Sequence, residues 1–294
     1  MEQSLNNENK VRVLSYPDYK ETEIYAKLLE QLNKADQEYE ELDLSIFGTK
    51  FNSELLPKED KYGNIISVGG DGTALKGMYL AYQSNSVLLP LGLGEIGYLV
   101  NSDKRKYSKL IKQIIENKFV DNDISERTVI SCSTVNQDWP VFNEIAISKT
   151  GANTLLEFNI KFNNESIDLK ADGIVVSTSG GSTAYSYSAG GPIVDPSFDS
   201  VVITPIAPFS KFPRSIVLPS STSISISIGT PTYYITSIQP KYDIFFDGVL
   251  VSEQPKDQKT HSTLFEIKQN ERKAKILGIS NNANVSEFLS QILR

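Results

Sequence analysis

Residues 69–73, Gly-Gly-Asp-Gly-Thr, form the segment of the chain best suited to chemistry. They follow a short apolar run at 65–68 and precede a helical pattern. Glycines let the main chain approach a phosphate closely, and the amides of such a turn and helix start point towards it. Asp71 fits this setting if it handles a hydroxyl proton or a magnesium ion, because a bare carboxylate repels phosphate. The structural alternative is an ordinary turn in which Asp71 caps the helix.

A second turn of similar composition lies within 171–196, where an apolar strand runs into serine, threonine and glycine residues and then a helix start. Ser182 or Thr183 is placed to cap that helix. Tyr185 follows, where it can stack on a flat base or form a hydrogen bond. The alternative is a well-capped surface helix whose small residues permit close packing. Two such turns, one of them carrying an acid, favour a nucleotide held at a domain interface.

Asn143 and Glu144 lie inside a predicted strand at 141–148. By alternation, Asn143 shares a face with the apolar residues Val141 and Ile145, and a polar amide on such a face needs partners. One interpretation is a core amide bonded to the main chain, and the other is a pair that binds a base or ribose. Because neighbouring strand residues point to opposite faces, binding of one ligand by both predicts a local irregularity at 143–144.

The first part of the chain alternates strands and helices. Strands are predicted at 11–14, 42–46, 65–68 and 87–91, and helices at 22–33, 73–83 and 104–117. This alternation is typical of an open, mainly parallel sheet with helices on its faces. We therefore expect an α/β domain over residues 1–123.

From residue 124 to 279 the chain reads as many short strands with one helical segment at 182–189. The stretch 222–228 alternates serine and isoleucine, which indicates one buried and one wet face. This pattern predicts a β-rich second domain over 124–279. A helix over 280–294 is expected to return to the first domain.

Composition narrows the function classes. The chain has 294 residues and a net charge of −7, which argues against nucleic acid as the main partner. It contains one cysteine and one histidine, so no intrachain disulfide can form, a reducing cytoplasm is the natural compartment, and a His/Cys metal site is not expected. Residues 1–10 lack the apolar core of a signal peptide, and no run approaches the roughly 20 apolar residues of a membrane span.

Together these segments resemble the NAD kinase family. The resemblance rests on the glycine turn at 69–72, on the Asn143-Glu144 pair and on the stretch 172–192, with further matches at 94–99, 214–219 and Asp247-Gly248. The glycine turn alone is shared with diacylglycerol and sphingosine kinases and with phosphofructokinases. The pair and the second cluster single out NAD kinases.

The resemblance implies an α/β domain and a β-rich domain with the active site between them. It implies transfer of a phosphoryl group from ATP or polyphosphate, with magnesium, to the 2′-hydroxyl of the adenosine ribose of NAD. By this analogy Asp71 holds or deprotonates that hydroxyl, and Asn143 and Glu144 bind the adenosine end. The other implied contacts are the phosphate-lining residues Gly69, Gly70, Gly72 and Thr73, the dinucleotide-lining residues Thr183, Ala184, Tyr185 and Ser188, and Asp172 at a base end, within the chain or across a subunit boundary. A cytoplasmic homodimer or homotetramer is expected.

The chain departs from the family pattern at three positions. Gly180 stands where the family has a hydroxyl residue, Phe209 where many members have histidine, and Gly92 where many have asparagine. Two alternatives therefore stay open beside an NAD kinase. One is a lipid kinase that shares the glycine turn, and the other is a catalytically weak dinucleotide sensor.

Overall fold

The computed structural model describes residues 10–44, 63–94, 97–133, 139–150, 155–209, 214–229, 241–251 and 262–279. The chain divides into two compact units. One contains the described residues up to Arg127 and those from Lys273 onward, and the other runs from Thr128 to Arg272. The segments 124–127 and 273–279, which the sequence analysis placed in the second domain, thus belong to the first unit.

The first unit is built on a six-stranded sheet in the order β2-β1-β3-β4-β17-β5. All neighbouring strands are parallel except the pair of β17 and β5. The strands are β1 (Val11–Ser15), β2 (Tyr39–Asp43), β3 (Ile65–Gly69), β4 (Val87–Gly92), β5 (Ile124–Arg127) and β17 (Ala274–Leu277). The expected α/β unit with a mainly parallel sheet is confirmed.

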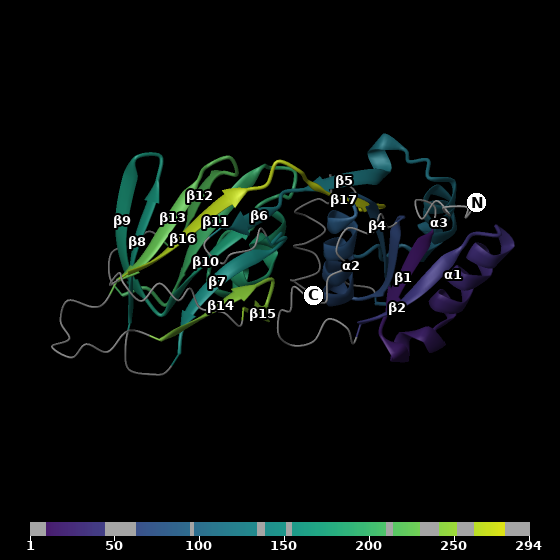
Figure 1. Cartoon of the computed structure of the whole chain (residues 1–294), viewed down its shortest axis with the longest axis horizontal. Coiled ribbons are helices and arrows are strands. Elements are labelled where there is room, and N and C mark those ends of the chain that lie inside the picture. Colours follow the sequence, from purple (N-terminus) through teal and green to yellow (C-terminus); the bar gives the residue numbers. More distant parts are fainter. Residues whose placement is uncertain are drawn as a thin grey trace, which may run out of the picture. The chain divides into compact units, whose positions relative to one another are not determined.

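Helices cover both faces of this sheet (Figure 1). Ile66 and Leu89 face α1 (Glu23–Lys34) and α3 (Tyr107–Glu116) in one buried cluster. The alternate residues Ser67 and Leu88 face α2 (Asp71–Gln83), where Gly77 allows close contact. Short 3₁₀ turns occupy η2 (Pro17–Glu21), η5 (Lys104–Lys106) and η6 (Asp121–Asp123).

Strand order reverses between β1 and β3, because β2 and β3 flank β1 on opposite sides. Ligands of open α/β sheets bind outside the carboxyl ends of the strands at such a reversal. The turn at Gly69-Gly70-Asp71 directly follows β3 and so lies at this point of the sheet.

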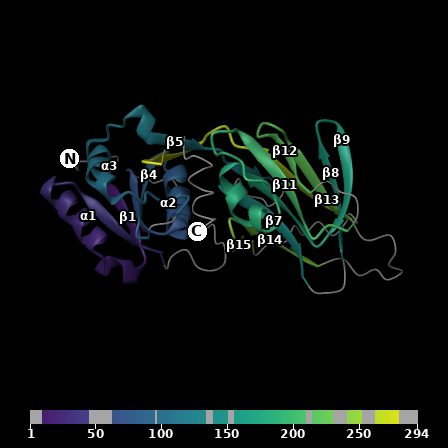
Figure 2. The ribbon, with the colours of Figure 1, turned by 180° about the vertical axis from the view of Figure 1, so that it is seen from behind.

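The second unit consists of two antiparallel sheets, seen from opposite sides in Figures 1 and 2. One has the order β12 (Ile216–Pro219), β11 (Ser200–Ile206), β10 (Gly173–Thr178), β7 (Glu144–Lys149), β14 (Tyr242–Phe246) and β15 (Val249–Leu250). The other has the order β6 (Ile130–Cys132), β16 (Ser262–Gln269), β13 (Ile224–Gly229), β8 (Leu156–Phe162) and β9 (Glu165–Ala171). The expected β-rich unit is confirmed.

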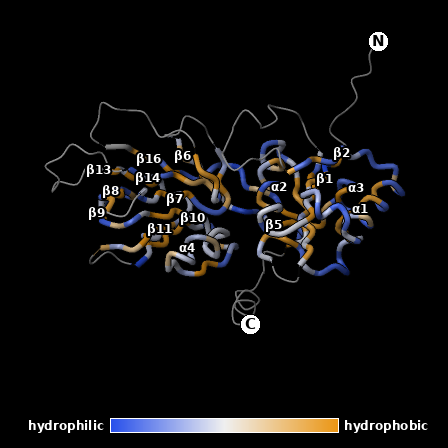
Figure 3. Tube along the Cα trace, turned by 90° about the horizontal axis from the view of Figure 1, so that it is seen from below, coloured by the Kyte–Doolittle hydropathy of each residue, from blue (hydrophilic) through white to orange (hydrophobic). Residues whose placement is uncertain are grey.

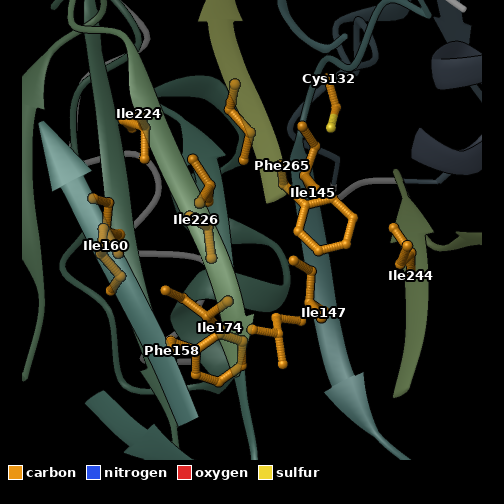
Figure 4. Close-up of a cluster of buried hydrophobic side chains, with 14 of the residues drawn as sticks. Cys132, Ile145, Ile147, Phe158, Ile160, Ile174, Ile224, Ile226, Ile244 and Phe265 are labelled. Carbon is orange, nitrogen blue, oxygen red and sulfur yellow. The ribbon is translucent and has the colours of Figure 1, made fainter. Parts of the chain in front are cut away.

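One buried cluster joins the facing sides of these two sheets (Figure 4). It brings Ile145 and Ile174 of one sheet together with Phe158, Ile226 and Phe265 of the other. In β13 the isoleucines are buried while the serines between them are partly exposed, as the alternation predicted. Figure 3 shows the corresponding hydrophobic stretches along β7, β10 and β11.

Some elements differ in extent from the sequence prediction. β2 ends at Asp43, and the strand expected from 141 begins only at Glu144. The helix expected at 182–189 is a 3₁₀ turn, η7 (Gly180–Thr183), followed by a single helical turn, α4 (Tyr185–Ser188), because Ala184 has non-helical angles of φ −91 and ψ −127. The expected helix at 280–294 lies outside the described residues. Among the described helices none is long and apolar enough to span a membrane.

Adjacent residues of β16 provide a test of the sheet packing. Phe265 is 0% exposed and Leu264 is 46% exposed. We expect Phe265→Ala to lower the free energy of unfolding by about 3–5 kcal/mol, since it leaves a cavity in the core. Leu264→Ala should change it by about 0.5 kcal/mol or less, as a surface substitution does. Urea denaturation of both variants checks this, and equal losses would contradict the assigned faces.

Candidate functional site

The glycines of the first turn serve different purposes. A Cβ on Gly69 would collide with the side chain of Thr73, so Gly69 permits the tight strand-to-helix packing. Gly70 and Gly72 are exposed, and a Cβ on either would meet nothing within 4 Å. The main chain at Gly70 and Gly72 is therefore open at the start of α2, where helix amides attract anions. Thr73 itself is buried.

Asp71 is held by the loop that follows β4. Its Oδ2 accepts the main-chain N–H of Tyr98 at 3.0 Å, and its Oδ1 accepts that of Leu99 at 2.9 Å. Its side chain makes no cap to α2, so the capping alternative is wrong. A Cβ on Gly97 would collide with Val100 Cγ2 and would also lie 3.0 Å from Oδ1, so the loop has no room for a side chain there. The two amides orient the carboxylate and leave each oxygen a further lone pair for a ligand hydroxyl or metal.

The 97–101 loop is itself anchored to the sheet. The Asn101 side-chain amide donates to the carbonyl oxygens of Pro90 and Leu277, both at 3.0 Å. The Tyr107 hydroxyl lies 2.7 Å from the Gly92 carbonyl oxygen and 2.6 Å from that of Asn101. Asp71 is thus oriented by a loop that β4, β17 and α3 hold in place. The main-chain N–H of Gly92 also donates to the Asn101 carbonyl at 2.9 Å.

In the second unit the chain bends at residues 142–143, and β7 starts at Glu144. The irregularity predicted at this pair is confirmed. Thr178 fixes the carbonyls of the bend, because its hydroxyl donates to Phe142 O at 2.6 Å and its main-chain N–H donates to Asn143 O at 2.9 Å. Asn143 is partly exposed, whereas Glu144 is 5% exposed.

Asp247 binds the amides of the same bend. Its Oδ1 accepts the main-chain N–H groups of Asn143 at 2.6 Å and Glu144 at 3.1 Å, and its Oδ2 accepts that of Phe142 at 3.0 Å. Asp247 and Gly248 form the two-residue turn between β14 and β15, with φ values of 50 and 76. Positive φ at both positions is typical of the type I′ hairpin turns that Asp-Gly favours.

The buried Glu144 and the partly exposed Asp247 form an acidic pair. Burial, followed by the charge of Asp247, raises the pKa of Glu144 to about 8, although the nearby amide of Tyr185 opposes this. Burial also raises the pKa of Asp247 to about 6, against the effect of its three amide donors. Among the described residues no hydrogen-bond partner meets the Oε2 atom of Glu144. The carboxyl therefore keeps its proton at neutral pH, with one oxygen available to a ligand.

The second glycine turn packs directly on Asn143. A Cβ on Gly181 would collide with the main chain of Asn143, and the Gly181 N–H donates to the Thr178 hydroxyl at 3.0 Å. Ser182 does not cap a helix, contrary to expectation. Its hydroxyl instead donates to Val194 O at 3.1 Å and accepts the Val194 N–H at 3.0 Å. Thr183 also makes no cap to α4, whose flanking residue is Ala184.

The remaining predicted contacts divide into two groups. Tyr185 and Ser188 are exposed and Thr183 and Ala184 are partly exposed, all on the chain that follows Gly181. Asp172 lies elsewhere. It precedes β10, whose Ser177 pairs with Glu144, so five residues at about 3.3 Å each put it roughly 16 Å along the strand.

Asp172 forms an ion pair at its own end of β10, away from Glu144. Its carboxylate pairs with the Lys149 ammonium at 2.5 Å. Within one chain, Asp172 and Glu144 therefore cannot contact the same part of a ligand. Phe209, another departure from the family pattern, is 65% exposed.

The sequence reasoning assigned no role to four residues that orient the site. The amides of Tyr98 and Leu99, the hydroxyl of Thr178 and the carboxylate of Asp247 all orient site residues from distant segments. The Asp-Gly dipeptide at 247–248 is a recognisable hairpin signal. It indicates a turn, but not which amides the aspartate binds.

Comparisons with known proteins agree with this arrangement. The family described as ATP-NAD kinase C-terminal domain matches residues 142–258. The NAD kinase of Treponema denticola is 32% identical over 207 residues, which cover 67% of this chain and 72% of that protein. An NAD kinase from Archaeoglobus fulgidus, solved in complex with ATP, has a TM-score of 0.69 at 21% identity, covering 97% of this chain and 98% of that one. The fold is therefore that of an NAD kinase.

This chain belongs to the NAD kinase family. It is also 31% identical over 199 residues to the bifunctional NADP phosphatase/NAD kinase of Methanocaldococcus jannaschii. That match covers 65% of this chain and 34% of the relative, so the chain spans about a third of that protein.

The raised pKa of Glu144 predicts how the free energy of unfolding depends on pH. Its pKa rises from 4.5 to about 8 on folding, so the folded protein holds a proton that the unfolded chain loses. The resulting stabilisation is complete below pH 4.5 and is lost as pH rises through 8. Between pH 6 and 8 we expect the free energy of unfolding to fall, relative to Glu144→Gln, by about 1 kcal/mol per pH unit.

Urea denaturation at several pH values measures this difference. Glu126→Gln, at an exposed position, is the matched control and should follow the wild type. A constant offset between wild type and Glu144→Gln across that range would show that Glu144 is already ionised.

Proposed function

We propose that this protein is an NAD kinase, which phosphorylates the 2′-hydroxyl of the adenosine ribose of NAD with ATP. The observation that carries the proposal is the Asp71 carboxylate, fixed by the amides of Tyr98 and Leu99 beside an open glycine turn at the start of α2. A positioned carboxylate next to an anion-binding helix start suits transfer of a phosphoryl group to a hydroxyl.

Asp71 acts on the acceptor. As the ribose 2′-oxygen forms its bond to the γ-phosphorus of ATP, the bond from that phosphorus to the leaving ADP oxygen breaks. The hydroxyl proton passes to an oxygen of Asp71, whose amide contacts leave lone pairs available for it. Phosphoryl transfer depends mainly on positioning and charge neutralisation, so this small set of groups is sufficient.

Magnesium fits the residues present. The described residues contain no cluster of three or more His, Cys, Asp or Glu side chains, which is consistent with a metal bound mainly by substrate phosphates. Asp71 is the carboxylate that would hold it. When bound, magnesium neutralises phosphate charge in the transfer.

Binding roles follow from exposure and chemistry. The open main chain at Gly70 and Gly72 receives phosphates, while Gly69 and Thr73 support the turn by packing on each other. Asn143 and the unpartnered oxygen of Glu144 bind the adenosine end. Tyr185 offers an exposed ring for stacking. The other contacts with the dinucleotide come from Thr183, Ala184 and Ser188.

Asp172 has a separate role because it lies far from Glu144 along β10. It binds a base end of a dinucleotide, in its own chain or in the neighbouring copy of a homodimer or homotetramer. We place the protein in the cytoplasm, where its buried Cys132 stays reduced.

The lipid-kinase alternative shares only the glycine turn of the first unit. The family match at 142–258 covers Asn143 and Glu144, the pair that this alternative lacks. The curated relatives from Treponema denticola and Flavobacterium johnsoniae are named NAD kinases. A coupled assay for NADP formation separates a kinase from a dinucleotide sensor.

The role of Asp71 is tested by Asp71→Asn. We expect NADP formation to fall by about 10²- to 10⁴-fold, since a general base is removed. One amide of the 97–99 loop loses its acceptor, so the free energy of unfolding should fall by about 1 kcal/mol. Asp121→Asn, at an exposed position, is the control for both measurements. Near wild-type turnover in Asp71→Asn would remove Asp71 from the mechanism.

Gly180 is tested by Gly180→Ser. Gly180 is not among the glycines with positive φ, so a serine side chain causes no backbone strain there. One added hydrogen bond contributes roughly 0.5–1.5 kcal/mol, so NAD should bind up to about tenfold more tightly. Calorimetric titration measures the affinity. Gly181→Ala at the next position is the matched comparison with the opposite expected effect. Its Cβ collides with the main chain of Asn143, so this variant should bind NAD more weakly. Unchanged affinity and stability in Gly180→Ser would mean that this position does not contact NAD.

A further inference from the structure

Asp247 is the group that holds the bend before β7. It accepts three consecutive main-chain N–H groups, those of Phe142, Asn143 and Glu144, at distances from 2.6 to 3.1 Å. The contact is reciprocal, because the main-chain N–H of Asp247 donates to the Glu144 carbonyl oxygen at 2.9 Å. Asp247 therefore fixes the amides of residues 142–144, while Thr178 fixes the carbonyls of Phe142 and Asn143.

This arrangement is more than an ordinary hairpin requires. Asparagine or glycine also supports a type I′ turn, without placing a charge beside Glu144. Asp247 instead lies, partly exposed, beside the buried Glu144, and its charge is a cause of the raised pKa of Glu144. In the described part of the chain, neither carboxylate forms a salt bridge. A buried acid next to a second acid, with no cation between them, costs free energy, so this placement calls for a functional reason.

The unpartnered Oε2 atom of Glu144 supplies that reason. The Glu144 side chain is 5% exposed, and a buried carboxyl oxygen without a hydrogen-bond partner is costly until a ligand group reaches it. A single atom, Asp247 Oδ1, accepts the main-chain N–H groups of both Asn143 and Glu144. This one atom therefore helps to set the main-chain direction from which both side chains extend.

We propose that Asp247 is a positioning residue for dinucleotide binding, which fixes the bend at 142–144 and thereby aims the Asn143 and Glu144 side chains at the ligand. This inference rests on the proposed function, because it takes NAD as the ligand of the pair. Asp247 does not itself touch the substrate.

Two variants of Asp247 separate its geometry from its charge. Asp247→Ala removes all the amide contacts, and the calorimetric dissociation constant for NAD should rise by about tenfold or more, as expected for lost hydrogen bonds to a charged group. Asp247→Asn keeps an oxygen at the Oδ1 position for Asn143 and Glu144, so it should rescue most of the affinity at neutral pH. ATP affinity should stay unchanged in both.

Gly248→Ala is the matched control. It strains the same turn, because Gly248 has φ 76, yet it leaves the carboxylate and its three amide contacts in place. We expect it to lower the melting temperature without changing NAD affinity. A loss of NAD affinity equal to that of Asp247→Ala would show that Asp247 acts only through hairpin stability and would overturn the proposal.

The pH profile supplies a readout that a structural role would not change. Asp247 is the titratable group that acts on Glu144, and α4 contributes only the main-chain amide of Tyr185. Asp247→Asn removes the repulsion, so the midpoint of the pH dependence of NAD affinity should move to lower pH. Gly248→Ala should keep the wild-type midpoint. An unshifted midpoint in Asp247→Asn, or wild-type NAD affinity in folded Asp247→Ala, would overturn the proposal.

The two proposals fail in different ways. Absence of NADP formation by the wild type, with NAD binding retained, would defeat the proposed function alone. NADP formation by the wild type, with wild-type NAD affinity in Asp247→Ala, would defeat the positioning role alone.

Discussion

A carboxylate removed from water must meet N–H donors or carry a proton, and this requirement shapes each candidate segment of the chain. Asp71 satisfies it with the amides of Tyr98 and Leu99, and Asp247 with the three amides of residues 142–144. Each aspartate thereby fixes a loop that comes from a distant part of the chain. Glu144 meets the same requirement by keeping its proton.

Asp71 and Asp247 differ in what their carboxylate oxygens can still contact. The Asp71 carboxylate is partly exposed beside an open glycine turn, so its remaining lone pairs can meet a ligand directly. Asp247 is also partly exposed, but both of its carboxylate oxygens accept main-chain N–H groups, so its proposed effect on a ligand passes through the residues that carry those amides. In the proposed arrangement, Asn143 and Glu144 contact the ligand and Asp247 orients them. The same kind of carboxylate–amide contact thus underlies a proposed direct role for Asp71 and a proposed positioning role for Asp247.

Glycines in the two turns show a comparable division. Gly69 and Gly181 lie where any side chain would collide with protein, against Thr73 and Asn143 respectively. Gly70 and Gly72 face open space, where the absence of a side chain exposes main-chain amides. The sequence shows the same residue, glycine, at all of these positions. Only the packing separates a glycine that closes a turn from one that admits a ligand.

The sequence by itself determined the two unit types, most element positions, the glycine turn after a strand and the irregular pair at 143–144. These features depend on short-range physics: apolar periodicity, glycine sterics and the alternation of side chains along a strand. It placed the boundary between the units before β5, at residues 123 and 124, whereas β5 pairs with β17 in the first unit. It also predicted Ser182 or Thr183 as a helix cap, whereas the Ser182 hydroxyl bonds to Val194. The partners that decide these features, β17 and Val194, come from elsewhere in the chain. The partners of Asp71 and Asp247, and the separation of Asp172 from Glu144, were decided by the tertiary structure alone. Hydrogen bonds between distant segments depend on which strands pair and in which register, and local residue patterns do not specify that.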